Sequence, residues 1–224
     1  MNRRFALAAL PLLIALTAAA PKRKPAPPPP PSRPIPQVPL VLPDVVKVAM
    51  VTEFGTIELA LDAQHAPVTT RNFLTYAVQK RFDGTAFYRA MKLKWGASPN
   101  GLVQGGTQMD PRRILKPIAH EPTSATGIRH VAGTISMARY APGTATGDFS
   151  IMLADMPSLD ADPKSSDPEA QAGFAAFGQV VAGMDVVQKI FAAPVSETKG
   201  EGVMRGQMLE PVVRIVSVRM VPTR

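Results

Sequence analysis

The chain has 224 residues, no cysteine and a formal net charge of +8. Six of the 25 Lys and Arg residues precede Asp44, whereas all 17 Asp and Glu residues lie from Asp44 onward, so the 19 remaining basic residues leave this part with a charge of +2. The composition excludes disulfide and thiol chemistry. It also argues against nucleic-acid binding, because no basic stripe with interleaved aromatic residues is present.

The first 20 residues have the composition of a secretory signal peptide. Two arginines at positions 3 and 4 precede an apolar run over residues 5–16, and three alanines follow at 18–20. We therefore predict a signal peptide over residues 1–20, secretion across the inner membrane and a periplasmic location. The apolar run is short for a membrane span. Because Pro21 disfavours cleavage after Ala20, both earlier cleavage and a retained anchor stay open, and membrane contact is expected only through this region if it is uncleaved.

Residues 21–43 form a proline-rich linker in this interpretation. Five consecutive prolines occupy positions 27–31, with basic residues on both sides. Such a segment cannot bury a core, so we expect an extended polyproline spacer with a rise of roughly 3 Å per residue. The alternative is a disordered tail that remains after processing.

From Asp44 onward the pattern changes to that of a folded domain, predicted over residues 44–224. Apolar residues alternate with polar ones over residues 46–50 and again over 57–61, with Gly55 between them, which predicts a hairpin with one buried face. Residues 67–81 follow with a proline near the start, an apolar face and a basic end, and they predict an amphipathic helix.

Residues 82–106 contain the most informative polar residues of the domain. Asp83-Gly84 predicts a turn, and residues 86–89 predict a strand on which Phe87 and Arg89 share one face. An arginine beside apolar rings can pack its stem on them and aim its fork of donors into a partly dry groove. The alternative is a surface arginine that extends over the edge of a strand.

The last third of the domain predicts a second helix and a closing strand. Residues 183–191 place apolar side chains on one helical face before Pro194, and residues 216–220 alternate apolar and polar side chains. Short strands separated by glycine-rich turns favour a barrel over a β-α-β architecture.

Several other chemistries find little support in the sequence. The three histidines, His65, His120 and His130, lie far apart in the sequence and form no recognisable metal-ligand pattern. No G-x-S-x-G motif indicates a hydrolase. The pair Gly105-Gly106 lacks the other glycines and the lysine of a phosphate-binding loop. We therefore expect neither a metal nor another cofactor.

Five motifs, in this order and spacing, resemble a cyclophilin-type peptidyl-prolyl cis/trans isomerase of the bacterial, exported kind: FDGTAFYR (82–89), LVQGG (102–106), GTISMAR (133–139), ATGDF (145–149) and AAFGQVVAGMDVV (175–187). The resemblance extends over about residues 45–221. It implies a mainly β fold, a closed antiparallel barrel of about eight strands capped by two α-helices, with a proline-binding groove on one outer face. It also implies a monomer that acts on proline-containing polypeptides.

The resemblance and the chemistry of the reaction together suggest roles for particular residues. Twisting an X-Pro amide leaves a lone pair on the proline nitrogen, which a fixed donor stabilises more in the twisted state than in the planar one. Arg89 is the predicted donor, and Gln104 is the predicted catalytic partner that holds a backbone group of the substrate. The predicted substrate-binding residues are Phe87, Leu102, Met137, Ala138, Phe149, Leu159 and Trp95.

The chain also departs from the family pattern around the expected proline pocket. Gly101 and Ser150 occupy positions where the family usually has pocket phenylalanines, and an insertion over residues 92–100 precedes Gly101. Trp95, within that insertion, is expected to refill the gap. Ser158 and Phe174 replace the usual aromatic residue and histidine. The expected consequence is a weaker or altered grip on the proline ring.

Two other functions remain as alternatives to an isomerase acting on exported proteins. Retained Arg89 and Gln104 favour the enzyme, whereas Gly101 and Ser150 favour a proline-binding chaperone or interaction module with little catalysis. A third interpretation is a structural protein tethered to the envelope, in which the proline-rich linker is the main feature.

Overall fold

The computed structural model describes residues 35–96 and 98–222; the predicted signal peptide and residues 21–34 of the predicted linker lie outside the described residues. Nine strands of this part form one sheet: β1 (Val45–Thr52), β2 (Gly55–Asp62), β3 (Ala86–Lys92), β4 (Gly101–Gly106), β5 (Thr134–Met137), β6 (Asp148–Met152), β7 (Ala176–Ala182), β8 (Val195–Ser196) and β9 (Met208–Met220).

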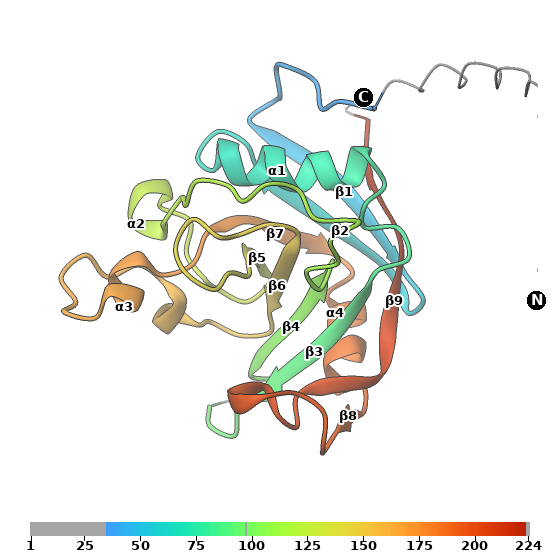
Figure 1. Ribbon diagram of the computed structural model, residues 1–224, viewed down its shortest axis with the longest axis vertical. Helices are drawn as coiled ribbons and strands as arrows, with labels where there is room; N and C mark the ends of the chain where they lie inside the picture. The colour runs from blue at the N-terminus through green and yellow to red at the C-terminus, as the bar shows by residue number, and fades with distance from the viewer. Residues whose placement is uncertain (1–34, 97, 223–224) are drawn as a thin grey trace, which may run out of the picture. The chain divides into compact units, whose positions relative to one another are not determined.

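Eight of these strands close into a barrel (Figure 1). They pair in the order β1-β2-β7-β5-β6-β4-β3-β9, β9 pairs back to β1, and every pairing is antiparallel. The two-residue β8 pairs with β9 only. Closure leaves no unpaired edge in the ring, so its backbone hydrogen bonds are satisfied within the barrel. The predicted mainly β, closed antiparallel barrel is confirmed.

The two longer helices are those that the sequence predicts. They are α1 (Pro67–Val78) and α4 (Met184–Ala192), and two short helices, α2 (Thr123–Thr126) and α3 (Pro168–Ala172), were not predicted. Pro67 starts α1 without a local side-chain cap. Instead the Glu121 carboxylate accepts hydrogen bonds from the amides of Val68 and Thr69, at 3.1 and 2.8 Å, which satisfies helix-terminal donors from a distant loop.

Strand β3 departs from the regular alternation that the sequence predicts. In its pairing with β4, Phe87 lies opposite Gly105 and Arg89 lies opposite Gln104, so Tyr88 is an extra residue without a partner. Such a bulge lets two consecutive side chains take the same side of a strand. Phe87 consequently points into the barrel, where it is fully buried, while Tyr88 and Arg89 both face outward. The prediction that Phe87 and Arg89 share a face is therefore wrong.

The barrel interior is centred on a cluster of phenylalanines. Phe73 from α1 lies 4.9 Å from Phe82 and 5.5 Å from Phe149 between ring centroids, and Phe149 lies 5.7 Å from Phe87. The contacts of Phe149 are edge-to-face, a favoured geometry for aromatic pairs. Burial of these rings joins α1 to β3 and β6, and it explains why this amphipathic helix covers one end of the barrel.

Residues that precede β1 are also attached to the domain. Val38 and Leu42 pack against the core, and the Arg71 guanidinium on α1 donates to the carbonyl oxygens of Pro39 and Leu40 at 3.0 and 2.8 Å. The last part of the predicted linker, from residue 35, thus follows the surface of the domain. Among the helices of the described chain, none has the length and apolarity to span a bilayer.

The phenylalanine cluster generates a stability prediction. Phe149→Ala should lower the free energy of unfolding by about 3–5 kcal/mol, because it removes a fully buried ring and leaves a cavity. Urea denaturation measures the change. Trp95→Ala is the control; this side chain is 69% exposed, so its loss should change stability by no more than about 0.5 kcal/mol. Equal effects of the two substitutions would contradict the proposed core.

Candidate active site

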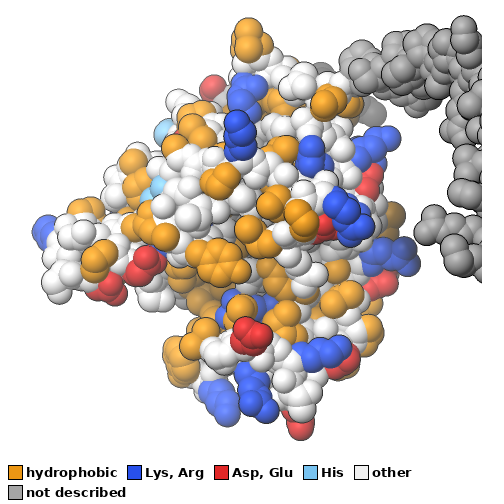
Figure 2. Space-filling view, in the orientation of Figure 1, with side chains coloured by type: hydrophobic (Ala, Val, Ile, Leu, Met, Phe, Trp, Pro, Cys, Tyr) orange, Lys and Arg blue, Asp and Glu red, His pale blue; other side chains and the backbone are white. Residues whose placement is uncertain are grey.

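A cavity of about 410 Å³ opens on the outer side of β3, β4 and β6. Its walls include side chains from these strands, from the loops that follow β4 and β5, and from the 3-10 turn η2 (Gly202–Met204). Hydrophobic side chains gather over the middle of this face, with charged ones more scattered around them (Figure 2). The cavity lining combines apolar side chains such as Met109 and Met208 with polar ones such as Arg89 and Gln104, a mixture that is usual for ligand pockets.

Arg89 is held in this cavity by two glutamine side chains. Its Nη1 donates to Oε1 of Gln104 at 2.9 Å, and its Nε donates to Oε1 of Gln207 at 2.9 Å. No group among the described residues accepts a hydrogen bond from its Nη2, and the side chain lines the cavity. Burial lowers the pKa of Arg89 from its ordinary value, but a guanidinium stays protonated in proteins.

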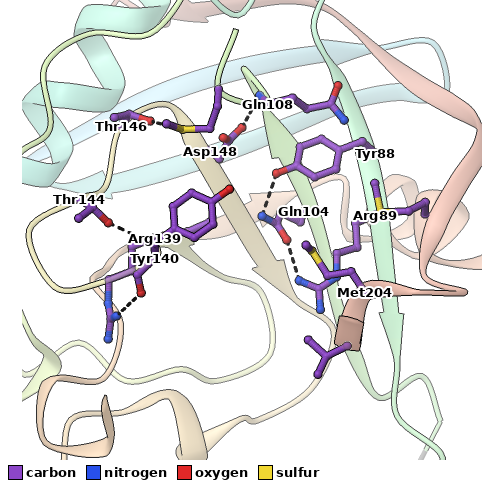
Figure 3. Close-up of a pocket in the computed structure, with 14 residues that line it drawn as sticks. Tyr88, Arg89, Gln104, Gln108, Arg139, Tyr140, Thr144, Thr146, Asp148 and Met204 are labelled. Carbon is purple, nitrogen blue, oxygen red and sulfur yellow. Dashed lines mark hydrogen bonds between the residues drawn. The ribbon is translucent and has the colours of Figure 1, made fainter. Parts of the chain in front are cut away.

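Gln104 links Arg89 to a tyrosine in the same wall (Figure 3). Its Nε2 donates to the Tyr88 hydroxyl at 2.8 Å, while its Oε1 accepts from Arg89. This pattern fixes the orientation of the amide. Burial raises the pKa of Tyr88, so its hydroxyl is neutral and can still donate its own proton.

The two glycines after Gln104 allow the wall to pack closely. A side chain at Gly105 would come within 2.9 Å of the Phe87 ring, and one at Gly106, where φ is +132°, would collide with Gly147 and Asp148. Asp148 in turn accepts a hydrogen bond from the Gln108 amide at 2.8 Å. That bond supports a turn in which Gln108 and Met109 both have positive φ, at 49° and 57°. Burial raises the pKa of Asp148.

The far rim of the cavity is supported by an arginine that is itself buried. Arg139 stacks over Phe174 at 4.6 Å, donates to the Gly173 carbonyl and pairs with Glu169 at 2.7 Å. These contacts fix the backbone next to Tyr140. The Tyr140 side chain is 78% exposed and lines the cavity. The loop over residues 138–146 is also joined to α1, because Asn72 donates to the Thr146 carbonyl at 2.7 Å.

Comparison with known proteins agrees with this arrangement. The family model described as cyclophilin type peptidyl-prolyl cis-trans isomerase/CLD matches residues 47–220, which is most of the chain. The chain belongs to this family. This chain is 36% identical to a peptidyl-prolyl cis-trans isomerase of Acinetobacter baylyi over 177 residues. The alignment covers 77% of this chain and 84% of the relative.

Two further comparisons concern the enzyme class and the fold. Peptidyl-prolyl cis-trans isomerase A of Dickeya dadantii is 35% identical over 170 residues, covering 74% of this chain and 80% of the relative. The family and these relatives identify the chain as a peptidyl-prolyl cis-trans isomerase. A crystal structure of a Cryptosporidium parvum cyclophilin type isomerase has a TM-score of 0.61 at 16% identity, covering 80% of this chain and 99% of that one, which supports the fold alone.

Within this cyclophilin, the predicted site residues divide into three groups. Arg89, Gln104 and Ala138 line the cavity. Phe87, Met137 and Phe149 are at most 3% exposed and belong to the barrel core, so their prediction as substrate contacts is corrected. Phe87 points inward because the bulge at Tyr88 separates it from Arg89. Met137 and Phe149 point inward because of their positions on β5 and β6.

The remaining predicted residues lie outside the cavity lining. Leu102 is buried in a small outer cluster with Met152 and Met156, against which Leu159 packs. Trp95 is 69% exposed in the connection between β3 and β4, and it is absent from the cavity lining. The expectation that Trp95 refills the pocket therefore has no support in its position.

Gly101 cannot simply be replaced by the family's phenylalanine in this backbone. Its φ is +139°, and a side chain there would collide with the Met91 carbonyl oxygen and approach Phe191 at 3.1 Å. Ser150, the other departure, is buried and pairs with Gln104 on β4 and Ser136 on β5. The methionine-rich cluster around Leu102 fills space beside these positions, which is a common use of the flexible methionine side chain.

Several residues that line the cavity, and Gln207, which contacts Arg89 without lining it, are not identified from the sequence. Regular alternation with Phe87 and Arg89 on one face would place Tyr88 on the opposite face, away from Arg89. Gln207 is 118 residues from Arg89 in the chain, and Met204 and Tyr140 belong to loops without a local signal. Only Tyr88 had a nearby clue, since it directly precedes the predicted catalytic arginine.

His130, Asp160 and Ser136 form a second polar cluster. His130 Nδ1 contacts Asp160 Oδ1 at 2.7 Å, and its Nε2 contacts Ser136 Oγ at 2.8 Å. The order of groups resembles a hydrolytic triad, but His130 is 1% exposed and Ser136 is 2% exposed, so a substrate cannot reach the hydroxyl. The cluster instead fastens the segment before β5 to the turn that follows η1 (Pro157–Leu159). In the described ranges, no three His, Asp or Glu side chains gather as a metal site requires.

This cluster generates a prediction about pH. Burial lowers the pKa of His130 below 6.5, so the unfolded chain takes up this proton more readily than the folded one. The stability that neutral His130 contributes is fully present above pH 6.5, and it should be lost as the pH falls through the folded-state pKa of this residue. Thermal unfolding at pH 7.5 and 5.0 should show a larger loss for the wild type than for His130→Asn. An equal loss would contradict a neutral His130 in the folded protein.

Proposed function

We propose that this cyclophilin accelerates X-Pro rotation through Arg89, which donates a hydrogen bond to the proline nitrogen as the amide twists. The barrier to rotation is about 18–20 kcal/mol, because amide resonance is lost in the twisted state. In that state the nitrogen carries a lone pair that the planar amide lacks. A donor already fixed in place lowers the barrier without a cost of reorganisation during the reaction.

The observation that carries this proposal is the clamping of Arg89 by Gln104 and Gln207. Both acceptors are neutral, so they orient the guanidinium without cancelling its charge, as a carboxylate would. Its Nη2 has no acceptor among the described residues and belongs to a side chain that lines the cavity. No covalent bond changes in this reaction, and the mechanism requires no cofactor or metal.

The substrates that we propose are proline-containing polypeptides with apolar residues near the proline. Met109, Tyr140, Val203 and Met208 supply apolar surface around the Arg89 and Gln104 groups. In Figure 3, Tyr140 and Met204 lie on different sides of Gln104, so a peptide could contact apolar groups on both. The Cryptosporidium parvum isomerase was also crystallised in the presence of the dipeptide Ala-Pro, which supports this substrate class.

A proline-binding chaperone with little catalysis is the second candidate. The filled methionine cluster beside Gly101 and Ser150 favours it, because the chain lacks two aromatic walls there. The two functions differ in what Arg89 contributes: an enzyme loses turnover without it, whereas a binder keeps most of its affinity.

The test of the catalytic role is Arg89→Ala in the full chain. We expect kcat/KM for an X-Pro tetrapeptide to fall by about 100-fold, a typical cost of removing a donor aimed at the transition state. Protease-free exchange measurements by NMR detect the turnover, and peptide titration detects binding. Trp95→Ala should leave turnover unchanged. Wild-type activity in Arg89→Ala would refute the proposed mechanism. A wild-type protein that binds the peptide but shows no turnover would favour the chaperone.

We further propose that the enzyme is exported and acts on exported proteins. The support is the arrangement of two arginines, an apolar run and three alanines in residues 1–20, ahead of the basic proline-rich linker. Expression in a Gram-negative host, followed by fractionation and N-terminal sequencing, should recover a periplasmic or envelope-bound protein. If the signal is cleaved, its new N-terminus should lie one or two residues before Pro21. Recovery of the full-length chain in the cytoplasm would contradict export.

A further inference from the structure

We propose that Gln207 is a positioning residue that sets the direction of the Arg89 guanidinium. The inference rests on the proposed function of Arg89 and extends it to a residue on a different part of the chain. Gln207 lies just before β9, at the end of the loop that carries η2. Its side chain reaches Arg89 from a direction that Gln104, on β4, does not cover.

Four hydrogen bonds hold Gln207 in this position. Its Oε1 accepts from Arg89 Nε at 2.9 Å, and its own Nε2 donates to the Val203 carbonyl at 2.7 Å. Its backbone carbonyl accepts from the Ala90 amide at 2.9 Å, and its backbone amide donates to Met204 at 3.1 Å. The acceptor for Arg89 is therefore fixed both to the strand that carries the arginine and to the η2 turn.

Two acceptors are needed to fix a planar group in a chosen orientation. With Gln104 alone, the guanidinium could pivot about the hydrogen bond from Nη1 to Gln104, which would turn Nη2 away from a ligand. A second bond at Nε defines the plane and limits this rotation. Bulging at Tyr88 makes this support more important, because Arg89 faces outward beyond the regular ladder between β3 and β4.

The loop that delivers Gln207 also supplies part of the cavity wall. Val203 is 85% exposed and Met204 lines the cavity from the same turn. Lys199 and Glu210 form an ion pair across the base of the loop, and the Gly206 amide donates to the Lys199 carbonyl at 3.0 Å. The loop thus joins a rim of the cavity directly to the orientation of the proposed catalytic donor.

The test uses Gln207→Met, which keeps the length of the side chain but removes both polar atoms. Gln179→Met is the matched control: the Gln179 amide makes the same two types of bond, with Thr134 and Ala132, at 3.2 and 2.6 Å, and it does not line the cavity. We expect Gln207→Met to lower kcat/KM about tenfold, mainly through kcat, because binding contacts remain while the donor is misaligned. Gln179→Met should stay within about twofold of the wild type.

A double-mutant cycle determines whether Gln207 acts through Arg89. In an Arg89→Ala background, Gln207→Met should have less than about a twofold effect, because the group it positions is already absent. A tenfold loss in both backgrounds would mean that the loop itself contributes to activity, and it would overturn the inference. A Gln207→Met enzyme as active as the wild type would overturn it as well.

A spectroscopic measurement gives an independent result. The Nε–H resonance of Arg89, assigned by its disappearance in Arg89→Ala, should be protected from exchange in the wild type and broadened in Gln207→Met. Retained protection in Gln207→Met would contradict the positioning role. If Arg89→Ala keeps full activity, the proposed catalytic role of Arg89 fails. If Arg89→Ala is inactive but Gln207→Met is fully active, only the role of Gln207 is rejected.

Discussion

The single extra residue at Tyr88 in β3 determines which side chains reach the cavity. In a regular strand, Tyr88 and Arg89 would point to opposite sides of the barrel wall. The bulge turns both outward while Phe87 and Ala90 keep their places in the core. A polar chain from Tyr88 through Gln104 to Arg89 can then form on the outer surface without removing an apolar residue from the interior. The bulge at Tyr88 thus allows β3 to contribute Phe87 and Ala90 to the core and Tyr88 and Arg89 to the cavity.

Much of the fold was predictable because its determinants are local. Alternation around Gly55 identified the β1-β2 hairpin, and Pro67 marked the start of α1, while the five spaced motifs implied a closed barrel. Site residues were less predictable, since regular alternation gives the wrong face once a bulge intervenes. Phe149 illustrates a further limit: an aromatic residue in a motif carries no mark that distinguishes a core ring from a pocket wall. Gln207 has no sequence signal, since only tertiary pairing of β3 with the segment before β9 brings it to Arg89.

The site is supported mainly by long-range polar contacts to backbone groups. Glu121 caps α1, Asn72 holds the carbonyl of Thr146, and Arg139 binds the carbonyl of Gly173. The first contact satisfies amides at the start of α1, and the other two satisfy loop carbonyls that have no ladder partner, which is a requirement of buried irregular structure. The loop over residues 138–146 is therefore fastened both to α1 and to the segment before β7. Such anchoring preorganises the wall of the cavity, as the proposed mechanism through Arg89 requires.

The cavity also has a sulfur-rich lining in a chain without cysteine. Met109, Met204 and Met208 all contribute to its wall, and Met109 is 41% exposed. Oxidation of a thioether to its sulfoxide replaces a flexible apolar group with a polar, chiral one. In an oxidising environment, the wall that is proposed to contact apolar peptide residues would then become more polar, while the barrel core stays buried. Methionine sulfoxide reductases would reverse that change, so the polarity of the cavity wall could be altered reversibly by oxidation without any disulfide.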